Sequence, residues 1–298
     1  MSEEVLDPIP EVHAGPFVSA SAPAIGRVEN EDLTGTVGDN TAWVLDGADD
    51  PLADRRRCTH GAAWYVRTLH QALGQSLTDD QEALNVLLQR AIQYTRDVHD
   101  TECENPTHRK PSAAIAIIRC HPRSIEYLVL GDASLLLESS SSVIRITDQR
   151  MHQVASDVRH AIIHRLRQGH GYDDPERPRL LRELVEQEQR ARNKATGYSI
   201  AAYDPTAAFD SVTETVDASD STTRIDRAVL LSDGAERAVS PFGICPDWIN
   251  FMKVVSTEGP AVCIKRIREA ELLDPSGKRQ PRTKFSDDAS ITLWNGNS

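Results

Sequence analysis

The feature that most constrains this chain is a set of short apolar runs that lie beside an acidic and a small residue. Asp46 follows one run and precedes Gly47, and Asp233 follows another and precedes a second glycine. Asp132 follows the run YLVLG, and Asp287 stands just before the run ASITLW. Short apolar runs bounded by turn residues predict buried β-strands. We therefore expect several packed strands whose ends carry carboxylates.

Helical periodicity separates these strand signals. Apolar residues recur at spacings of three and four over residues 54–75 and 79–100, and again over 248–255 and 262–273. Strands and helices do not alternate one for one, which disfavours a parallel doubly wound sheet and predicts an α+β fold with helices outside antiparallel sheets. The predicted strands cover residues 17–28, 40–46, 112–120, 124–130, 133–138, 143–147, 198–203, 211–216, 228–232 and 289–294.

Two segments stand apart from this pattern. Residues 1–16 are acidic and proline-bearing, and they predict a flexible tail ahead of one domain over residues 17–298. Residues 151–196 are long, charged and helix-like, and they predict a helical insert within that domain.

Composition and charge exclude several classes of protein. Acidic residues outnumber basic ones by 45 to 33, which gives a net charge of −12 and argues against a nucleic-acid partner. Apolar segments long enough to span a bilayer are missing, and the first residues lack the basic start and apolar core of a secretory signal. We therefore expect a soluble, cytoplasmic protein, a monomer, without a membrane partner.

Cysteine and histidine give little sign of a metal or catalytic site. The cysteines number five, an odd count without a Cys-x-x-Cys pair, so we expect buried reduced thiols rather than a disulfide framework or a zinc knuckle. Cys103 and Arg109 match the bare Cys-x5-Arg spacing of tyrosine phosphatases, but the loop between them lacks glycine to cradle a phosphate. His160 and His164 have a metal-compatible spacing without an evident third ligand, which favours a packing or solvated role.

The acids at the strand ends point to different chemistry. Mg²⁺ and Mn²⁺ prefer oxygen ligands, and a glycine beside an acid lets the backbone approach an ion closely. Two such ions can clamp a phosphoryl group and activate water. Each acid taken singly is explained as an ordinary turn residue. The whole set favours a metal site for phosphoryl chemistry.

The motifs that carry these acids resemble those of the bacterial PP2C-type (PPM) family of metal-dependent serine/threonine protein phosphatases. The segment GRVENED, residues 26–32, is similar to the region that opens the family's domain, and WVLDGAD resembles its first Asp-Gly motif. SAAIAII, LGDAS, LLSDGAER and SDDASITLW resemble its later motifs, in the family's order. Together they span about residues 17–296, almost the whole chain.

This resemblance implies an αββα sandwich of two antiparallel sheets flanked by helical layers, with two Mn²⁺ or Mg²⁺ ions at one edge. By the same resemblance, Asp46 would bridge the two ions. Asp233 and Asp287 would complete the first ion's ligands. Glu31 and the backbone carbonyl of Gly47 would bind the second ion.

Three further residues acquire roles from the resemblance. Asp32 would orient metal-bound water, and Asp132 would join Asp233 at the third ion seen in some members. Arg27 would clamp the substrate phosphate, since its planar fork can bind a phosphate through two hydrogen bonds. An ordinary surface ion pair is the alternative for Arg27.

The implied reaction is hydrolysis of phosphoserine or phosphothreonine by a water or hydroxide held between the two ions. The implied partner is a phosphoprotein, such as a serine/threonine kinase or its targets in bacterial signalling. Residues 151–196 correspond to a variable region near the family's cleft, and they would form either a mobile flap that selects substrates or a solvated pair of helices. Ala48, Ala133 and Asp288 depart from the family's pattern. They keep open the alternative of a weak or inactive domain that binds a partner.

Overall fold

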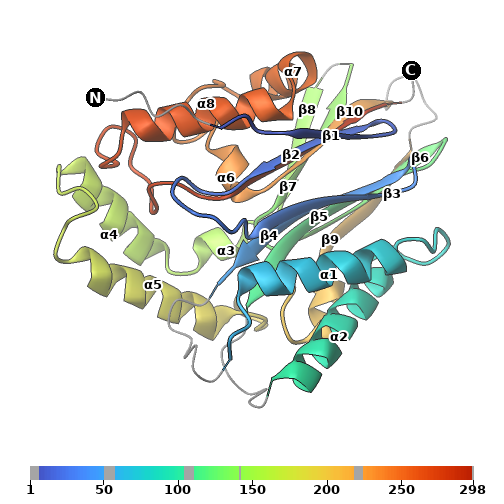
Figure 1. Ribbon diagram of the computed structural model, residues 1–298, viewed down its shortest axis with the longest axis horizontal. Coiled ribbons are helices and arrows are strands. Elements are labelled where there is room, and N and C mark those ends of the chain that lie inside the picture. Colours follow the sequence, from blue (N-terminus) through green and yellow to red (C-terminus); the bar gives the residue numbers. More distant parts are fainter. Residues whose placement is uncertain (1–6, 50–57, 104–110, 141, 218–223, 297–298) are drawn as a thin grey trace.

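A computed structural model describes the chain except for residues 1–6, 50–57, 104–110, 141, 218–223 and 297–298. Two antiparallel sheets pack face to face between two layers of helices (Figure 1). This arrangement confirms the predicted α+β class and the αββα sandwich.

One sheet has six strands in the order β1-β2-β11-β10-β7-β8, and the other has five in the order β3-β4-β5-β6-β9. Neighbouring strands are antiparallel throughout both sheets. The strands of the first sheet are β1 (Glu11–Ala14), β2 (Phe17–Ala22), β11 (Ala289–Asn295), β10 (Ile225–Leu231), β7 (Ser134–Ser139) and β8 (Ser142–Thr147). Those of the second are β3 (Asp32–Val37), β4 (Thr41–Ala48), β5 (Ser112–Cys120), β6 (Ser124–Leu130) and β9 (Val212–Asp217).

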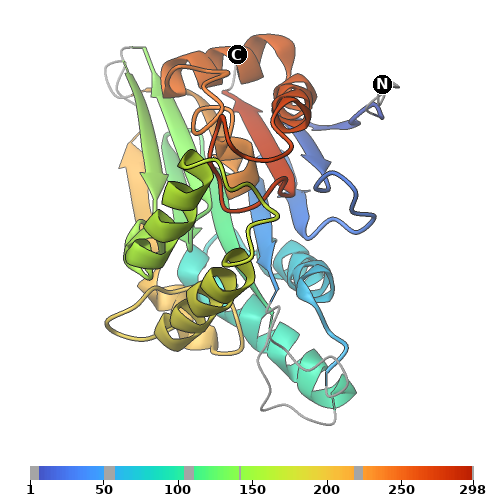
Figure 2. The same ribbon diagram turned by 90° about the vertical axis from the view of Figure 1, so that its left-hand side faces the viewer.

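The helices form the outer layers and one separate hairpin. Helices α1 (Ala62–Ser76) and α2 (Leu84–Glu102) cover the five-stranded sheet, and α7 (Trp248–Glu258) and α8 (Pro260–Leu273) cover the six-stranded one (Figure 1). Helices α4 (Ser156–Arg167) and α5 (Arg177–Ala191) pack on each other beside the sandwich (Figure 2). Shorter elements are α3 (Arg150–Gln153), the 3₁₀ helix η1 (Pro205–Asp210) and α6 (Asp233–Glu236).

The central strands are apolar on both faces because each face meets a different layer. In β4, Val44 lies in the core between the sheets, whereas its neighbour Leu45 packs under α1 and α2. In β10, Leu230 faces the core between the sheets and Val229 faces α7 and α8. Successive side chains of a strand point to opposite faces, so a strand covered on both sides needs a continuous apolar run.

Three predictions about local structure are wrong. The predicted flexible tail over 1–16 is too long, because Glu11–Ala14 form β1 and pair with β2. Residues 198–203 do not form a strand but make isolated bridges from Tyr198 and Ala201. The helix predicted over 54–75 begins only at Ala62; residues 54–57 lie outside the described part of the chain, as does Arg109.

The predicted insert over 151–196 contains the α4–α5 hairpin, which contacts a loop near the C-terminal strand. The Tyr172 hydroxyl donates to the backbone carbonyls of Arg282 and Lys284, at 3.2 Å each. The Arg177 guanidinium stacks 4.5 Å from the centre of the Tyr172 ring. The hairpin therefore touches the loop that leads to Asp287.

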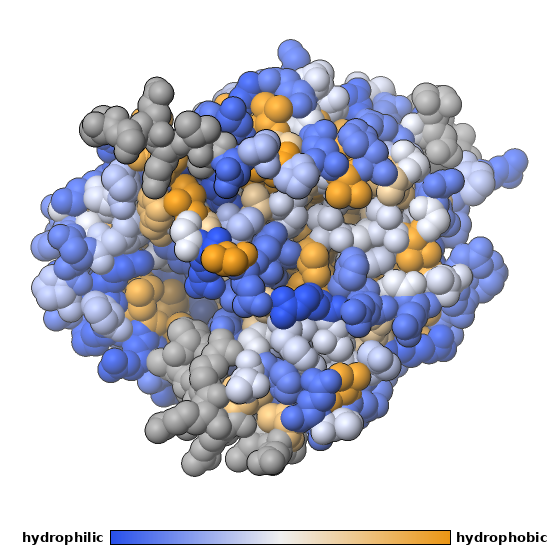
Figure 3. Space-filling view, viewed as in Figure 1, coloured by the Kyte–Doolittle hydropathy of each residue, from blue (hydrophilic) through white to orange (hydrophobic). Residues whose placement is uncertain are grey.

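Hydrophilic side chains cover most of the molecular face in Figure 3, and hydrophobic ones form small separate groups. This surface agrees with the chain's net charge of −12. Among the helices that the structure describes, none combines the length and the apolar character needed to cross a membrane.

Candidate active site

The acids predicted from the sequence meet where the two sheets come together. In the β3–β4 pair, Asp32 lies directly opposite Asp46. Asp233 follows β10 of the other sheet, and its backbone N–H donates to Asp46 Oδ2 at 3.0 Å. This bond joins the two sheets at the site.

These carboxylates lie close enough to perturb one another. Burial and the neighbouring charges of Asp32, Asp233 and Asp132 raise the pKa of Asp46 well above its ordinary value. Burial, together with Asp287 and Asp132, raises the pKa of Asp233 to about 6. Burial also raises the pKa of Asp132 to about 6. Burial is the largest cause of each shift, and neighbouring negative charges add to it.

Asp32 is the most buried of the acids, with 1% of its surface exposed. Burial is the main cause that raises its pKa well above the ordinary value, and a hydrogen bond from the Ser232 side chain opposes this shift. Its Oδ2 atom has no hydrogen-bond partner among the described residues. A buried carboxylate oxygen without a partner is costly, so this atom fits a site that is completed by a water molecule or a cation.

Asp287 differs from the other acids because two cations already hold it. Arg237 lies 2.8 Å from Asp287 Oδ2 and Lys284 lies 3.0 Å from Oδ1. Burial would raise the pKa of Asp287, but Lys284 and Arg237 outweigh it and hold that pKa below the ordinary value. Arg237 is itself fixed by Glu271 at 3.1 Å. Neither cation was predicted from the sequence.

The acids are near one another without forming a finished coordination sphere. Within the described residues, they do not supply three or more ligand atoms that all lie within 4.8 Å of one another. Binding of a divalent ion would therefore draw these side chains closer together than they stand here.

Glu31 and Gly47 are held together by the backbone. The Gly47 N–H donates to the carbonyl oxygen of Glu31 at 3.0 Å. A Cβ atom on Gly47 would lie 2.3 Å from that oxygen, so the position requires glycine. The Glu31 carboxylate pairs with Arg27 Nη1 at 3.1 Å, and Arg27 is 60% exposed. The structure thus places Arg27 at the rim of the site, next to a predicted ligand.

Two departures from the family's pattern have structural explanations. The Asp288 carboxylate accepts the backbone N–H of Ala24 on Oδ1 and that of Glu31 on Oδ2, at 2.6 Å each. An asparagine has a single acceptor oxygen in its side chain, so only the acid can accept both bonds on separate oxygens. Ala133 is fully buried in the core between the sheets, where an apolar residue belongs. Nothing in the structure explains Ala48.

A cavity of about 360 Å³ opens beside Glu31. Ligand pockets commonly begin at roughly this size, about 300 Å³. Three acids and residues at the start of α1 line the cavity. The lining residues are Glu29, Glu31, Asp49, Thr59, Gly61, Ala62, Ala63, Trp64 and Arg67.

Comparison with known proteins gives a consistent result. The family model described as "Protein phosphatase 2C" matches residues 28–262. No curated protein sequence matches the chain.

Several solved structures share the fold. Serine/threonine phosphatase Stp1 from Staphylococcus aureus aligns with a TM-score of 0.55 and 14% identity, over 96% of this chain and 98% of that one. The catalytic domain of PstP, solved with 2 manganese ions, gives 0.52 and 16%, over 93% and 96%. MsPP from Mycobacterium smegmatis, solved with cacodylate, gives 0.51 and 13%, over 94% and 97%. Since the family model spans most of the chain, the chain belongs to the protein phosphatase 2C family, whose solved relatives here are serine/threonine phosphatases.

Proposed function

We propose that this protein removes phosphate from phosphoserine and phosphothreonine with Mn²⁺ or Mg²⁺ as cofactor. One observation carries the proposal: Asp32, Asp46 and Asp233 meet at the junction of the two sheets, where burial and neighbouring negative charges raise their pKa values. Bound cations would relieve this repulsion. Membership of the protein phosphatase 2C family supports the same proposed function.

The donors at the site suit hard divalent ions, because they are oxygen atoms throughout. Asp46, Asp233 and Asp287 would hold one ion, and Asp46, Glu31 and the carbonyl of Gly47 a second. Asp132 with Asp233 would hold a third ion if one binds. When bound, such ions would acidify a water molecule and neutralise phosphate charge. PstP, a structural relative, was solved with 2 manganese ions.

The chain's own residues would position the water and the substrate. Asp32 presents its unpaired Oδ2 as a hydrogen-bond acceptor, which suits it to orient a water molecule. The backbone N–H of Asp233 fixes the orientation of the Asp46 carboxylate. Arg27, exposed beside Glu31, can exchange that carboxylate for two oxygens of an incoming phosphate.

The partner that we propose is a phosphoprotein, such as a serine/threonine kinase or one of its targets. The cavity beside Glu31, which Arg67 helps to line, is the place that we propose for the phosphorylated side chain. Cytoplasmic location and a monomeric state stay predictions from the sequence.

The test is turnover of p-nitrophenyl phosphate and of a phosphothreonine peptide, measured across a Mn²⁺ titration. We expect Mn²⁺-dependent release of phosphate that is lost in Asp46→Ala and kept in Asp80→Ala, an exposed acid between α1 and α2. Absence of Mn²⁺-dependent turnover in the wild type, or full turnover in Asp46→Ala, would contradict the proposal. The first result would favour a domain that binds phosphoproteins without hydrolysing them, and the second would mean that hydrolysis does not depend on Asp46.

A further inference from the structure

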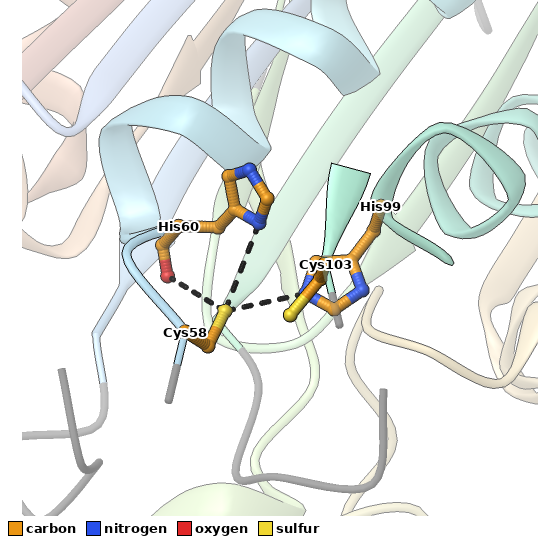
Figure 4. A group of neighbouring side chains, drawn as sticks. All are labelled: Cys58, His60, His99 and Cys103. Carbon is orange, nitrogen blue, oxygen red and sulfur yellow. Dashed lines mark hydrogen bonds between the residues drawn. The ribbon is translucent and has the colours of Figure 1, made fainter. Parts of the chain in front are cut away.

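Two cysteines and two histidines lie together outside the acidic site, where α1 begins and α2 ends (Figure 4). Cys58 and His60 lie just before α1. His99 lies in the last turn of α2, and the Cys103 N–H caps that helix by donating to the His99 carbonyl at 2.8 Å. One ligand atom from each residue lies within 4.8 Å of the other three. The cysteines are buried, as predicted, but the meeting of two of them with two histidines was not predicted from the sequence.

The spacing of these atoms matches a tetrahedral zinc site. Cys58 Sγ lies 3.7 Å from His60 Nδ1 and 3.4 Å from His99 Nε2. Zinc bonds of about 2.3 Å to sulfur and about 2.05 Å to nitrogen place neighbouring S and N ligands about 3.6 Å apart in a tetrahedron. Three of the four residues are buried, with exposed fractions of 7% for Cys58, 4% for His99 and 8% for Cys103.

The carboxylates around the histidines fit the same interpretation. The nitrogen of His60 that points away from Cys58, Nε2, lies 3.2 Å from Glu102 Oε2. The corresponding nitrogen of His99, Nδ1, lies 3.4 Å from Asp100 Oδ1. The Tyr203 hydroxyl donates to the other Asp100 oxygen at 2.7 Å. Zinc-binding histidines commonly donate their outer N–H to a carboxylate, which leaves the inner nitrogen free to bind the ion.

We propose that Cys58, His60, His99 and Cys103 bind one Zn²⁺ ion as a structural site. Thiolate and imidazole ligands select zinc over the hard ions that suit the acidic site. Four protein ligands would fill a tetrahedral ion, leaving no position for a substrate. The site is therefore structural, and the proposal does not depend on phosphatase activity.

The position of the cluster shows what a bound ion would stabilise. It would tie the segment that enters α1 to the end of α2. Thr59 and Gly61, which flank His60, line the cavity beside Glu31. Trp64, another lining residue, stacks on the His60 ring with 4.2 Å between ring centres. The zinc site would thus fix one wall of the candidate substrate cavity.

The first measurement is the metal content of the full chain, purified without a histidine tag and without added zinc. We expect about one tightly held zinc ion per chain, as for structural sites of four ligands. The matched variants are Cys58→Ala and Cys103→Ala, which should lose the zinc, and Cys120→Ala, a cysteine of the sheet core, which should keep it. Zinc retained in both ligand variants, or absent from the wild type, would overturn the proposal.

A second measurement does not require the ligand variants to fold. Co²⁺ added to chelator-treated wild type should give the intense visible bands of a tetrahedral ion and a thiolate-to-cobalt charge-transfer band. Asp100→Asn keeps all four ligands, and it should weaken zinc binding by about 10–100-fold in competition with a chelator. A six-coordinate Co²⁺ spectrum, or a mass that reveals a Cys58–Cys103 disulfide in the protein as purified, would contradict the zinc site.

Discussion

The acidic site and the cysteine–histidine cluster both border one cavity, yet they are built in opposite ways. The acids come from the ends of strands in both sheets and repel one another, and only Asp287 among the acids placed at the first ion is paired with cations. The four cysteines and histidines come from two neighbouring helix ends, and each histidine has its own carboxylate. A catalytic site must admit water and substrate, whereas a structural site can be closed around its ion. The difference predicts that the two sites respond separately to mutation, chelation and pH.

The largest effect should follow from Asp233→Asn. Losing a ligand at the acidic site should lower Mn²⁺-dependent turnover at least about 100-fold, because even residues just outside a ligand shell cost roughly 10–100-fold. Zinc content should stay unchanged. Without Mn²⁺ the variant should unfold at a higher temperature than the wild type, since one partly buried negative charge is gone. Asp226→Asn, near the start of the strand that precedes Asp233, is the control. It should change neither the Mn²⁺-dependent turnover nor the unfolding temperature.

The second effect is on stability. Cys103→Ala should lower the midpoint of thermal unfolding by at least about 5 °C, because a structural zinc site contributes several kcal/mol and about 1 kcal/mol shifts the midpoint of a large domain by roughly 2–4 °C. A zinc chelator should lower the wild-type midpoint similarly and leave the variant's midpoint unchanged. If the chelator acts equally on both proteins, the stabilising ion lies elsewhere.

The third effect is a pH dependence of the unfolding free energy that arises at the acidic site. Asp233 has a pKa of about 6 in the folded protein, above its ordinary value of 3.8. Between these pH values the folded state holds a proton that the unfolded chain has released, so this group's contribution to the unfolding free energy decreases as the pH rises. In metal-free protein, the stability gained by Asp233→Asn should therefore be larger at about pH 7 than at about pH 5. Urea unfolding of both proteins at each pH measures this difference, and an equal gain at both pH values would contradict it.

The elements that could be predicted best from the sequence are strands whose apolar residues form one continuous run. Strands β5 and β6 were placed to the residue, because each is a nearly unbroken apolar run bounded by polar residues. The nearness of Asp46 and Asp233 agrees with the sequence pattern, in which each acid follows an apolar run, although Asp46 lies within β4 rather than after it. The tail was misjudged because Glu11–Ala14 carry few apolar residues and depend on pairing with β2.

The sequence could not predict contacts that depend on how distant elements pack. Cys58 and His99 are 41 residues apart, and they meet only because α1 and α2 lie side by side. The available signals were Cys-x-His and His-x3-Cys, and neither is specific alone. Asp288 accepts two backbone N–H groups from distant parts of the chain, and its charge also helps to raise the pKa of Asp32. The pairing of Asp287 with Arg237 likewise depends on a helix that follows another strand.

The smallest effect tests how an ion would reach Asp287. Arg237 is 9% exposed and locked by Glu271, whereas the Lys284 side chain is 63% exposed and free to swing away. An ion that binds Asp287 Oδ1 must therefore displace Lys284. Exposed ion pairs contribute about 0.2–1 kcal/mol, so Lys284→Ala should lower the Mn²⁺ concentration for half-maximal activity by a factor of roughly 1.4 to 5.

Lys265→Ala is the matched control, because Lys265 is 60% exposed and faces Glu269 across one helical turn, far along the sequence from the acids. It should leave the Mn²⁺ requirement unchanged. Loss of turnover in Lys284→Ala at saturating Mn²⁺ would instead mean that this lysine contacts the substrate phosphate. In that case the ion pair with Asp287 would be a resting position for a substrate-binding residue, and the competition between Lys284 and the metal would be refuted.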